Sequence, residues 1–109
     1  MIKIAKKVSE KEAVKNGFNA VIELFNRRWT MKILWELRAR PLTFREIQTA
    51  CAEVSSSVLN VRLSQLREAQ LVAHGAGEGY ALTSWGQELL VEMRPMAQWA
   101  ARWYGATKS

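Results

Sequence analysis

Five short side chains in the segment 54–70 (VSSSVLNVRLSQLREAQ) have the types and spacing needed to contact the edges of nucleic-acid bases. Asparagine can pair in two places with adenine, valine can touch the methyl group of thymine, and a serine hydroxyl can reach a base or a phosphate. A merely solvated helix face usually carries lysine and glutamate; an ordinary polar surface with unusual serines remains the alternative. The expected base-reading residues are Ser56, Ser57, Asn60, Val61 and Ser64.

A helix over about 55–69 would bring these side chains onto one face. Leu59, Leu63 and Leu66 follow one another at the four- and three-residue spacing of a single buried stripe. At about 100° per residue, the short polar side chains then lie opposite the leucines. Ser55 precedes this helix, and we expect its hydroxyl to cap the first turn.

Positive charge gathers before this segment. The chain has a net charge of +6, and residues 1–45 hold eleven Lys and Arg against four Glu. Residues 27–45 alone hold six Lys and Arg against one Glu, an excess that would attract a polyanion. Cations and hydroxyls beside a base-reading helix would hold phosphates and set its register. The expected phosphate-binding residues are Arg28, Lys32, Thr43, Arg45 and Ser55.

The single cysteine and the single histidine offer little for catalysis. Cys51 has no partner for an internal disulfide, and its spacing from Phe44 and Ile47 places it on an inner helix face. His74 falls in a hairpin and is expected at the surface. The sequence contains no nucleophile–base pair, paired-carboxylate motif, phosphate loop or metal-ligand spacing. We therefore expect no enzyme, no cofactor and no metal site.

Three helices are expected ahead of the base-reading helix and its turn. A capping box at Ser9 and an apolar repeat predict the first over about 10–26, which Gly17 weakens and could divide in two. The second spans WTMKILWELR and ends before Pro41. A capping box at Thr43 and Glu46 begins the third. Residues 43–70 therefore have a helix-turn-helix layout.

A small hairpin and a long helix complete the chain. Residues 71–74 and 80–83 are expected to pair across a glycine turn, which makes the hairpin the wing of a winged helix. The last helix, capped by Thr83 or Ser84, has a heptad-like apolar seam and is bent by Pro95. The expected wing residues are His74, Gly75, Gly77 and Gly79.

Aromatic and methionine side chains on the last helix exceed what one small domain needs to cover, which favours a homodimer over plain core packing. The first helix carries a matching apolar face. The expected dimer contacts are Phe18, Val21, Phe25, Leu89, Met93, Met96, Trp99, Ala100 and Trp103.

Arg62 falls beside the leucine stripe and away from Asn60 and Ser57. We expect it to be structural, with its stem over the core and its guanidinium on a carboxylate such as Glu46 or Glu68.

The expected fold class is mainly α with a small β-hairpin: a winged helix-turn-helix with long N- and C-terminal dimerisation helices. One DNA-binding domain would span residues 1–109, since this length suits a single hydrophobic core. No run of 18 apolar residues and no leader pattern are present, so we expect no membrane span, no secretion signal and a cytoplasmic location. The expected parts are an N-terminal arm and helix (1–26), the helix-turn-helix and wing (27–83) and the dimerisation helix (84–106).

Four linked motifs resemble the HxlR-type winged-helix regulators over residues 18–104. They are Arg28-Trp29-Thr30-x-x-Ile33-Leu34-x-x-Leu37, similar to KWTLLILREL, Phe44-Arg45-Glu46-Ile47, similar to RFNEL, Ser55-x-x-Val58-Leu59-x-x-Arg62-Leu63-x-x-Leu66, similar to ISPKVLSQRLKEL, and Tyr80-x-Leu82-Thr83-x-x-Gly86-x-x-Leu89, similar to YSLTEKGRALL. The resemblance implies a small bacterial transcription regulator that binds operator DNA as a dimer, with the dimer contacts made by the first and last helices.

Two features depart from the family pattern. Many relatives carry a sensing cysteine shortly before the tryptophan motif, where this chain has Asn16, Gly17, Phe18 and Asn19. Their wing is usually longer and basic, whereas this one is short and contains an acid.

We therefore expect a dimeric, sequence-specific regulator that binds an inverted repeat in double-stranded DNA. The alternative is a winged-helix protein-interaction module without DNA binding, which the basic segment 27–45 argues against. An unknown small-molecule effector remains open, with a pocket between the first and last helices near Trp85, Trp99 and Phe18.

Overall fold

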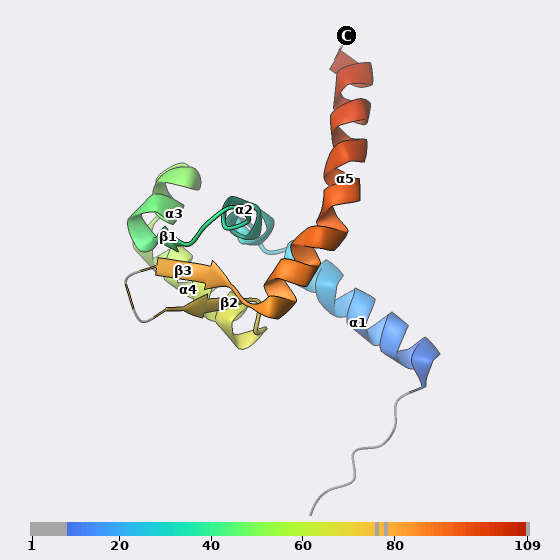
Figure 1. Cartoon of the computed structure of the whole chain (residues 1–109), viewed down its shortest axis with the longest axis horizontal. Coiled ribbons are helices and arrows are strands. Elements are labelled where there is room, and N and C mark those ends of the chain that lie inside the picture. The colour runs from blue at the N-terminus through green and yellow to red at the C-terminus, as the bar shows by residue number, and fades with distance from the viewer. Residues whose placement is uncertain (1–8, 76, 78, 109) are drawn as a thin grey trace, which may run out of the picture.

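The computed structural model describes residues 9–75, 77 and 79–108, in which five helices and three short strands form. In Figure 1, α1 and α5 extend away from a group made by the other elements. The predicted N-terminal arm, residues 1–8, lies outside the described residues. The elements are α1 (Glu10–Phe25), α2 (Thr30–Glu36), β1 (Leu42–Thr43), α3 (Phe44–Ala50), α4 (Ser56–Glu68), β2 (Val72–His74), β3 (Gly79–Leu82) and α5 (Ser84–Lys108).

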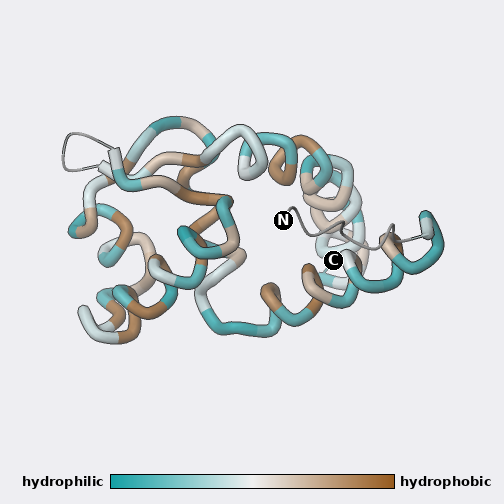
Figure 2. The backbone as a smooth tube through the Cα atoms, turned by 90° about the horizontal axis from the view of Figure 1, so that it is seen from below, coloured by the Kyte–Doolittle hydropathy of each residue, from teal (hydrophilic) through white to brown (hydrophobic). Residues whose placement is uncertain are grey.

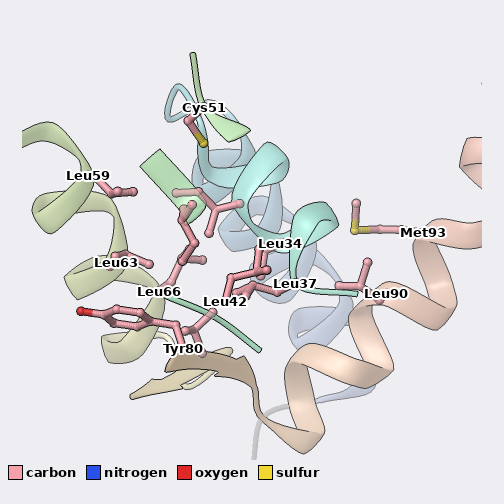
Figure 3. Packing of buried hydrophobic residues seen from close by; sticks show 13 residues of the cluster. Leu34, Leu37, Leu42, Cys51, Leu59, Leu63, Leu66, Tyr80, Leu90 and Met93 are labelled. Atoms are coloured by element: carbon pink, nitrogen blue, oxygen red, sulfur yellow. The ribbon is translucent and has the colours of Figure 1, made fainter. Parts of the chain in front are cut away.

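One cluster of apolar side chains lies where α2, α3 and α4 meet (Figure 3). Ile33 and Leu34 of α2 and Ile47 of α3 have no exposed surface. The stripe predicted for α4 is confirmed, since Leu59, Leu63 and Leu66 are all buried in this cluster. Burial on three helices at once fixes which face of α4 remains outside.

Two predicted helix caps are confirmed. Thr43 and Glu46 form the capping box, in which Thr43 Oγ1 accepts from the backbone N–H of Glu46 at 3.1 Å and the Glu46 carboxylate accepts from that of Thr43 at 2.9 Å. The Ser55 hydroxyl accepts from the backbone N–H of Val58 at 3.3 Å. Both helices of the motif therefore begin where the sequence indicates.

The first two helices differ in part from their predictions. α1 is one continuous helix, so its division at Gly17 is wrong. Trp29 does not belong to α2, because its φ of 78° places it in the left-handed region and α2 begins at Thr30. The reversal that lets the Trp29 ring pack against the core is incompatible with a helical backbone at that residue.

The sheet has three strands in the order β1-β3-β2, whereas only the hairpin was predicted. β3 pairs antiparallel with both neighbours, with Tyr80 opposite Leu42 on one side and Leu82 opposite Val72 on the other. β1 has two residues, too few to show a period in the sequence, and it forms because β3 supplies its partner.

α5 leaves the sheet through a tight contact. Thr83 Oγ1 accepts from the backbone N–H of Gly86 at 3.1 Å and donates to the Gln70 carbonyl at 2.6 Å, which selects Thr83 as the cap. A Cβ on Gly86 would lie 2.2 Å from the Leu71 carbonyl oxygen, so only glycine fits. The helix contains Pro95 and bends near its middle in Figure 1, as predicted.

Candidate nucleic-acid interface

The outer face of α4 presents the five short side chains that the sequence singled out. Ser56, Ser57, Asn60, Val61 and Ser64 are all exposed, on the side away from the leucine stripe. Val61 exposes 49 % of its surface, although it is apolar. The structure therefore brings the candidate base-reading residues together, and their contact with bases stays a prediction.

Arg67 extends this face and was missed by the sequence analysis. It is exposed on α4, three residues after Ser64 and seven after Asn60. Residues three and seven positions apart share one face of a helix, so the same periodicity could have identified Arg67 from the sequence. Within the described part of the chain its side chain has no ion pair.

The turn between α3 and α4 is fixed by its backbone and by one glutamine. Ala52 and Glu53 both have left-handed φ angles, 56° and 59°. Gln48 Nε2 donates to the Val54 carbonyl at 2.9 Å and to Ser56 Oγ at 3.3 Å. Gln48 therefore joins α3 to the beginning of α4, a role that its sequence position did not reveal.

Three of the six cations in residues 27–45 form ion pairs. Lys32 lies 2.9 Å from Glu36, Arg40 lies 2.8 Å from Glu46, and Arg45 lies 2.8 Å from Glu53. These pairs are largely exposed, so each is weak and can be exchanged for another anion. The local positive charge is thus smaller than the count over residues 27–45 indicates.

The Arg40–Glu46 pair also sets the ionisation of the capping box. The hydrogen bond from Arg40, together with that from the Thr43 backbone N–H, lowers the pKa of Glu46 to about 2. The same carboxylate raises the pKa of Arg40. Glu46 is therefore ionised at neutral pH, and its carboxylate holds the Arg40 guanidinium beside the beginning of α3.

Arg28 and Arg62 meet at the corner between α1 and α2. Arg62 Nε donates to the Arg28 carbonyl at 2.7 Å, and its Nη1 donates to Gln65 Oε1 at 3.3 Å. The structural role of Arg62 is confirmed, but the expected carboxylate partner is wrong. The Arg62 guanidinium donates instead to a backbone carbonyl beside Trp29, whose backbone is left-handed. The Arg28 guanidinium itself lies 5.0 Å from the Trp29 ring centroid.

The two hydroxyl candidates for phosphate contact both act as helix caps. The oxygens of Thr43 and Ser55 accept backbone N–H groups, as described above. A hydroxyl that accepts one bond still has its proton to donate. Their phosphate contacts therefore stay a prediction that the capping geometry permits.

The wing candidates lie at the hairpin formed by β2 and β3. His74 is exposed, as predicted, and its ring stacks on Tyr80 with 4.2 Å between centroids. The Gly75 N–H donates to the Gly79 carbonyl at 3.0 Å, one step beyond the His74–Tyr80 pair of the two strands. The acid expected in the wing, Glu78, lies outside the described residues.

Cys51 has no exposed surface, which confirms its predicted inner position. Burial raises the pKa of its thiol. Reaction through the thiolate is disfavoured on both grounds.

The predicted dimer residues divide into exposed and covered sets. On α1 Phe18 exposes 65 % of its surface, and on α5 Trp99 and Trp103 expose 54 % and 53 % and stack at 5.8 Å. Met93 is instead buried in the chain's own core, because α5 turns Leu90 and Met93 inward. Figure 2 shows hydrophobic positions recurring along both terminal helices. Met96 is exposed, and Val21, Phe25, Leu89 and Ala100 are half-buried.

The described residues offer neither a metal-binding cluster nor a membrane-spanning helix. No group of three or more His, Cys, Asp or Glu is placed to hold a metal ion in residues 9–75, 77 and 79–108. Over the same ranges no helix combines the length and apolarity needed to cross a membrane.

A helix-turn-helix whose second helix is followed by a hairpin, with the sheet completed by a strand before the motif, is a winged helix. The model of the HxlR-like helix-turn-helix family matches residues 24–108. The chain belongs to that family, whose members are transcriptional regulators.

The similar proteins agree with this assignment. The HTH-type transcriptional regulator YvaP of Bacillus subtilis (strain 168) is 26 % identical over 92 residues, which cover 79 % of this chain and 85 % of YvaP. Quinone-bound YodB of B. subtilis is 26 % identical with a TM-score of 0.73, over 80 % of this chain and 98 % of YodB. A protein from Thermoplasma volcanium GSS1 described as a possible HxlR family transcriptional factor shares the fold, with 23 % identity, a TM-score of 0.66 and 93 % of both chains covered.

Proposed function

We propose that this protein is a dimeric, sequence-specific transcription regulator whose α4 enters the major groove of double-stranded DNA. It acts by binding rather than by catalysis, as one winged-helix domain in the cytoplasm. The observation that carries the proposal is the outer face of α4, which gathers short hydrogen-bonding side chains and one valine on a helix held by three buried leucines. Such side chains approach base edges closely.

Each side chain of that face has a separate task. Asn60 is the best base reader, since its amide can bond adenine in two places. Val61 contacts a thymine methyl group, and Ser56, Ser57 and Ser64 reach bases or nearby phosphates. These base contacts would give the protein its sequence specificity.

A second set of residues holds the DNA backbone and fixes the register of α4. Arg45 is an exposed cation on α3, and Arg28 and Lys32 are exposed cations that precede the motif in the chain. Thr43 and Ser55 add hydroxyl donors. Since phosphates are alike in every duplex, these contacts give affinity more than specificity.

The dimer is supported by the apolar side chains left exposed on α1 and α5. Phe18, Met96 and Trp99 expose between 46 % and 65 % of their surfaces in the single chain. A two-fold partner would cover them and would present two copies of α4 to successive major grooves, about 34–36 Å apart. The preferred operator is accordingly an inverted repeat.

Selection of bound sequences from a random duplex pool tests this proposal, with a gel-shift titration of the winning sequence in increasing salt. The expected result is an inverted repeat whose affinity falls steeply with salt. A protein-interaction module is the competing function. It would be favoured if no duplex of any sequence binds even at low salt.

A small-molecule effector completes the proposal. One relative, YodB, has been solved with a bound quinone. In this chain an apolar hollow of about 310 Å³ opens between α2 and α5, within the size range of ligand sites. None of Trp85, Trp99 and Phe18, near which the sequence analysis expected the effector, lines this hollow. Its lining residues are Met31, Lys32, Trp35, Met93, Met96, Ala97 and Ala100.

A further inference from the structure

Glu53 lies in the turn between α3 and α4, beside one of the cations assigned to the DNA backbone. We propose that Glu53 is an affinity-determining residue, because it holds Arg45 in an ion pair that opposes the binding of a DNA phosphate. This inference rests on the proposed function and names a residue that weakens the same interface.

The contacts of Arg45 show the competition directly. Its Nη1 lies 2.8 Å from Glu53 Oε2 and 3.0 Å from Gln48 Oε1. The side chain of Arg45 is 70 % exposed and that of Glu53 is 53 % exposed, so DNA can reach both. Gln48 and Glu53 use both N–H groups of Nη1, so a phosphate bonds there only by displacing one of them, and at Nε or Nη2 it meets a guanidinium whose charge Glu53 already partly balances.

The backbone keeps Glu53 beside Arg45. Its N–H donates to the Gln48 carbonyl at 2.9 Å, and its left-handed φ of 59° belongs to the turn itself. Gln48 also donates to the Val54 carbonyl and to Ser56 Oγ. The ion pair therefore belongs to the same small network that positions the beginning of α4.

The other ion pairs of the described residues lack this position. Lys32 and Glu36 lie on one helix, four residues apart. Glu46 is committed to the capping box, and it keeps Arg40 with it. Only the Arg45–Glu53 pair, among these three, bridges α3 and the turn that leads into α4.

Loss of the carboxylate should strengthen DNA binding without changing sequence choice. An exposed ion pair is weak, so the Arg45–Glu53 pair lowers the affinity for DNA only modestly. Glu53→Gln should therefore bind a random duplex about two- to five-fold more tightly at low salt. The slope of log K against log salt should steepen by only a fraction of one, because Arg45 contacts a phosphate in both proteins and loses only its opposing charge. The preferred operator should gain the same factor.

The experiment is a fluorescence-anisotropy titration of one random duplex at several salt concentrations. Glu92→Gln is the matched control, since it removes an exposed acid on α5 and gives the same net charge. Arg45→Ala and the double variant Glu53→Gln/Arg45→Ala complete a double-mutant cycle. If Glu53 acts through Arg45, the gain disappears in the Arg45→Ala background. Thermal unfolding followed by circular dichroism confirms that each variant folds.

The outcomes separate this inference from the proposed function. Equal binding by wild type and Glu53→Gln, an equal gain in Glu92→Gln, or a gain that survives in Arg45→Ala would each overturn the role of Glu53 while leaving DNA binding intact. Absence of binding by wild type and Glu53→Gln to every duplex would overturn the proposed function, and this inference with it.

Discussion

The helix-turn-helix and the terminal helices differ in how far their apolar side chains are exposed. The leucine stripe of α4 and Ile47 of α3 are buried within the chain, and the outer face of α4 carries mostly polar groups. In α1 no residue is buried, and the outer half of α5 exposes Met96, Trp99 and Trp103. The first region buries its apolar side chains within one chain, whereas the second leaves apolar side chains exposed, as the proposed dimer requires.

The largest expected effect breaks the second region. Met96→Glu should dissociate the proposed dimer, because a charge buried in an apolar interface costs several kcal/mol unless it is paired. A loss of about 4 kcal/mol would weaken the dimer about a thousandfold. Sedimentation equilibrium measures the change. Gln98→Glu adds the same charge to an exposed polar position of α5 and should leave the dimer intact; an undisturbed Met96→Glu dimer would contradict the assignment.

The next effect breaks the first region. Leu63→Ala should lower the free energy of unfolding by about 2–5 kcal/mol, because a buried leucine leaves a cavity among α2, α3 and α4. Urea unfolding at a fixed protein concentration measures it. Val61→Ala is the control from the same helix, since Val61 is half-exposed and should cost far less. Similar losses from both variants would mean that α4 buries a different face.

The sequence predicted the helix-turn-helix well because its signals are local. The leucine spacing, the capping box at Thr43 and the Ser55 cap each depend on residues a few positions apart. They were therefore enough to predict α4, its outer face and the beginning of α3. The errors have non-local causes. β1 forms by pairing with β3, and Arg62 donates to the carbonyl of Arg28, 34 residues earlier in the chain. No local pattern reports either contact.

The terminal helices show the same limit in another form. The heptad-like seam correctly marked α5 as apolar, but it could not say which positions the chain covers by itself. Met93 packs inward and Met96 stays exposed, although both belong to one seam. Likewise, the count of cations in residues 27–45 overlooked acids that later residues supply, Glu46 and Glu53.

A smaller effect distinguishes a base contact from a phosphate contact, by comparing Asn60 on the outer face of α4 with Arg45 on α3. Asn60→Ala should cost about 1–3 kcal/mol on the preferred operator and much less on random duplex, because the bidentate contact forms only with the right base. Its salt slope should not change. Arg45→Ala provides the contrast, since it should weaken both duplexes alike and flatten the slope by about one. Equal weakening of all duplexes by Asn60→Ala would place the reading face elsewhere.

The smallest effect concerns Cys51, and it asks how far burial in the helix-turn-helix protects its chemistry. Cys51→Ala should leave operator affinity unchanged, because the thiol has no exposed surface and lies on the inner face of the motif. Burial also raises the pKa of the thiol, so little thiolate forms at neutral pH. Diamide should therefore change the binding of wild type and Cys51→Ala to the same small extent in a gel-shift titration. Release of wild type by diamide that is lost in Cys51→Ala would show that α3 opens far enough to expose its core, and that the first region is less complete in one chain than its buried leucines indicate.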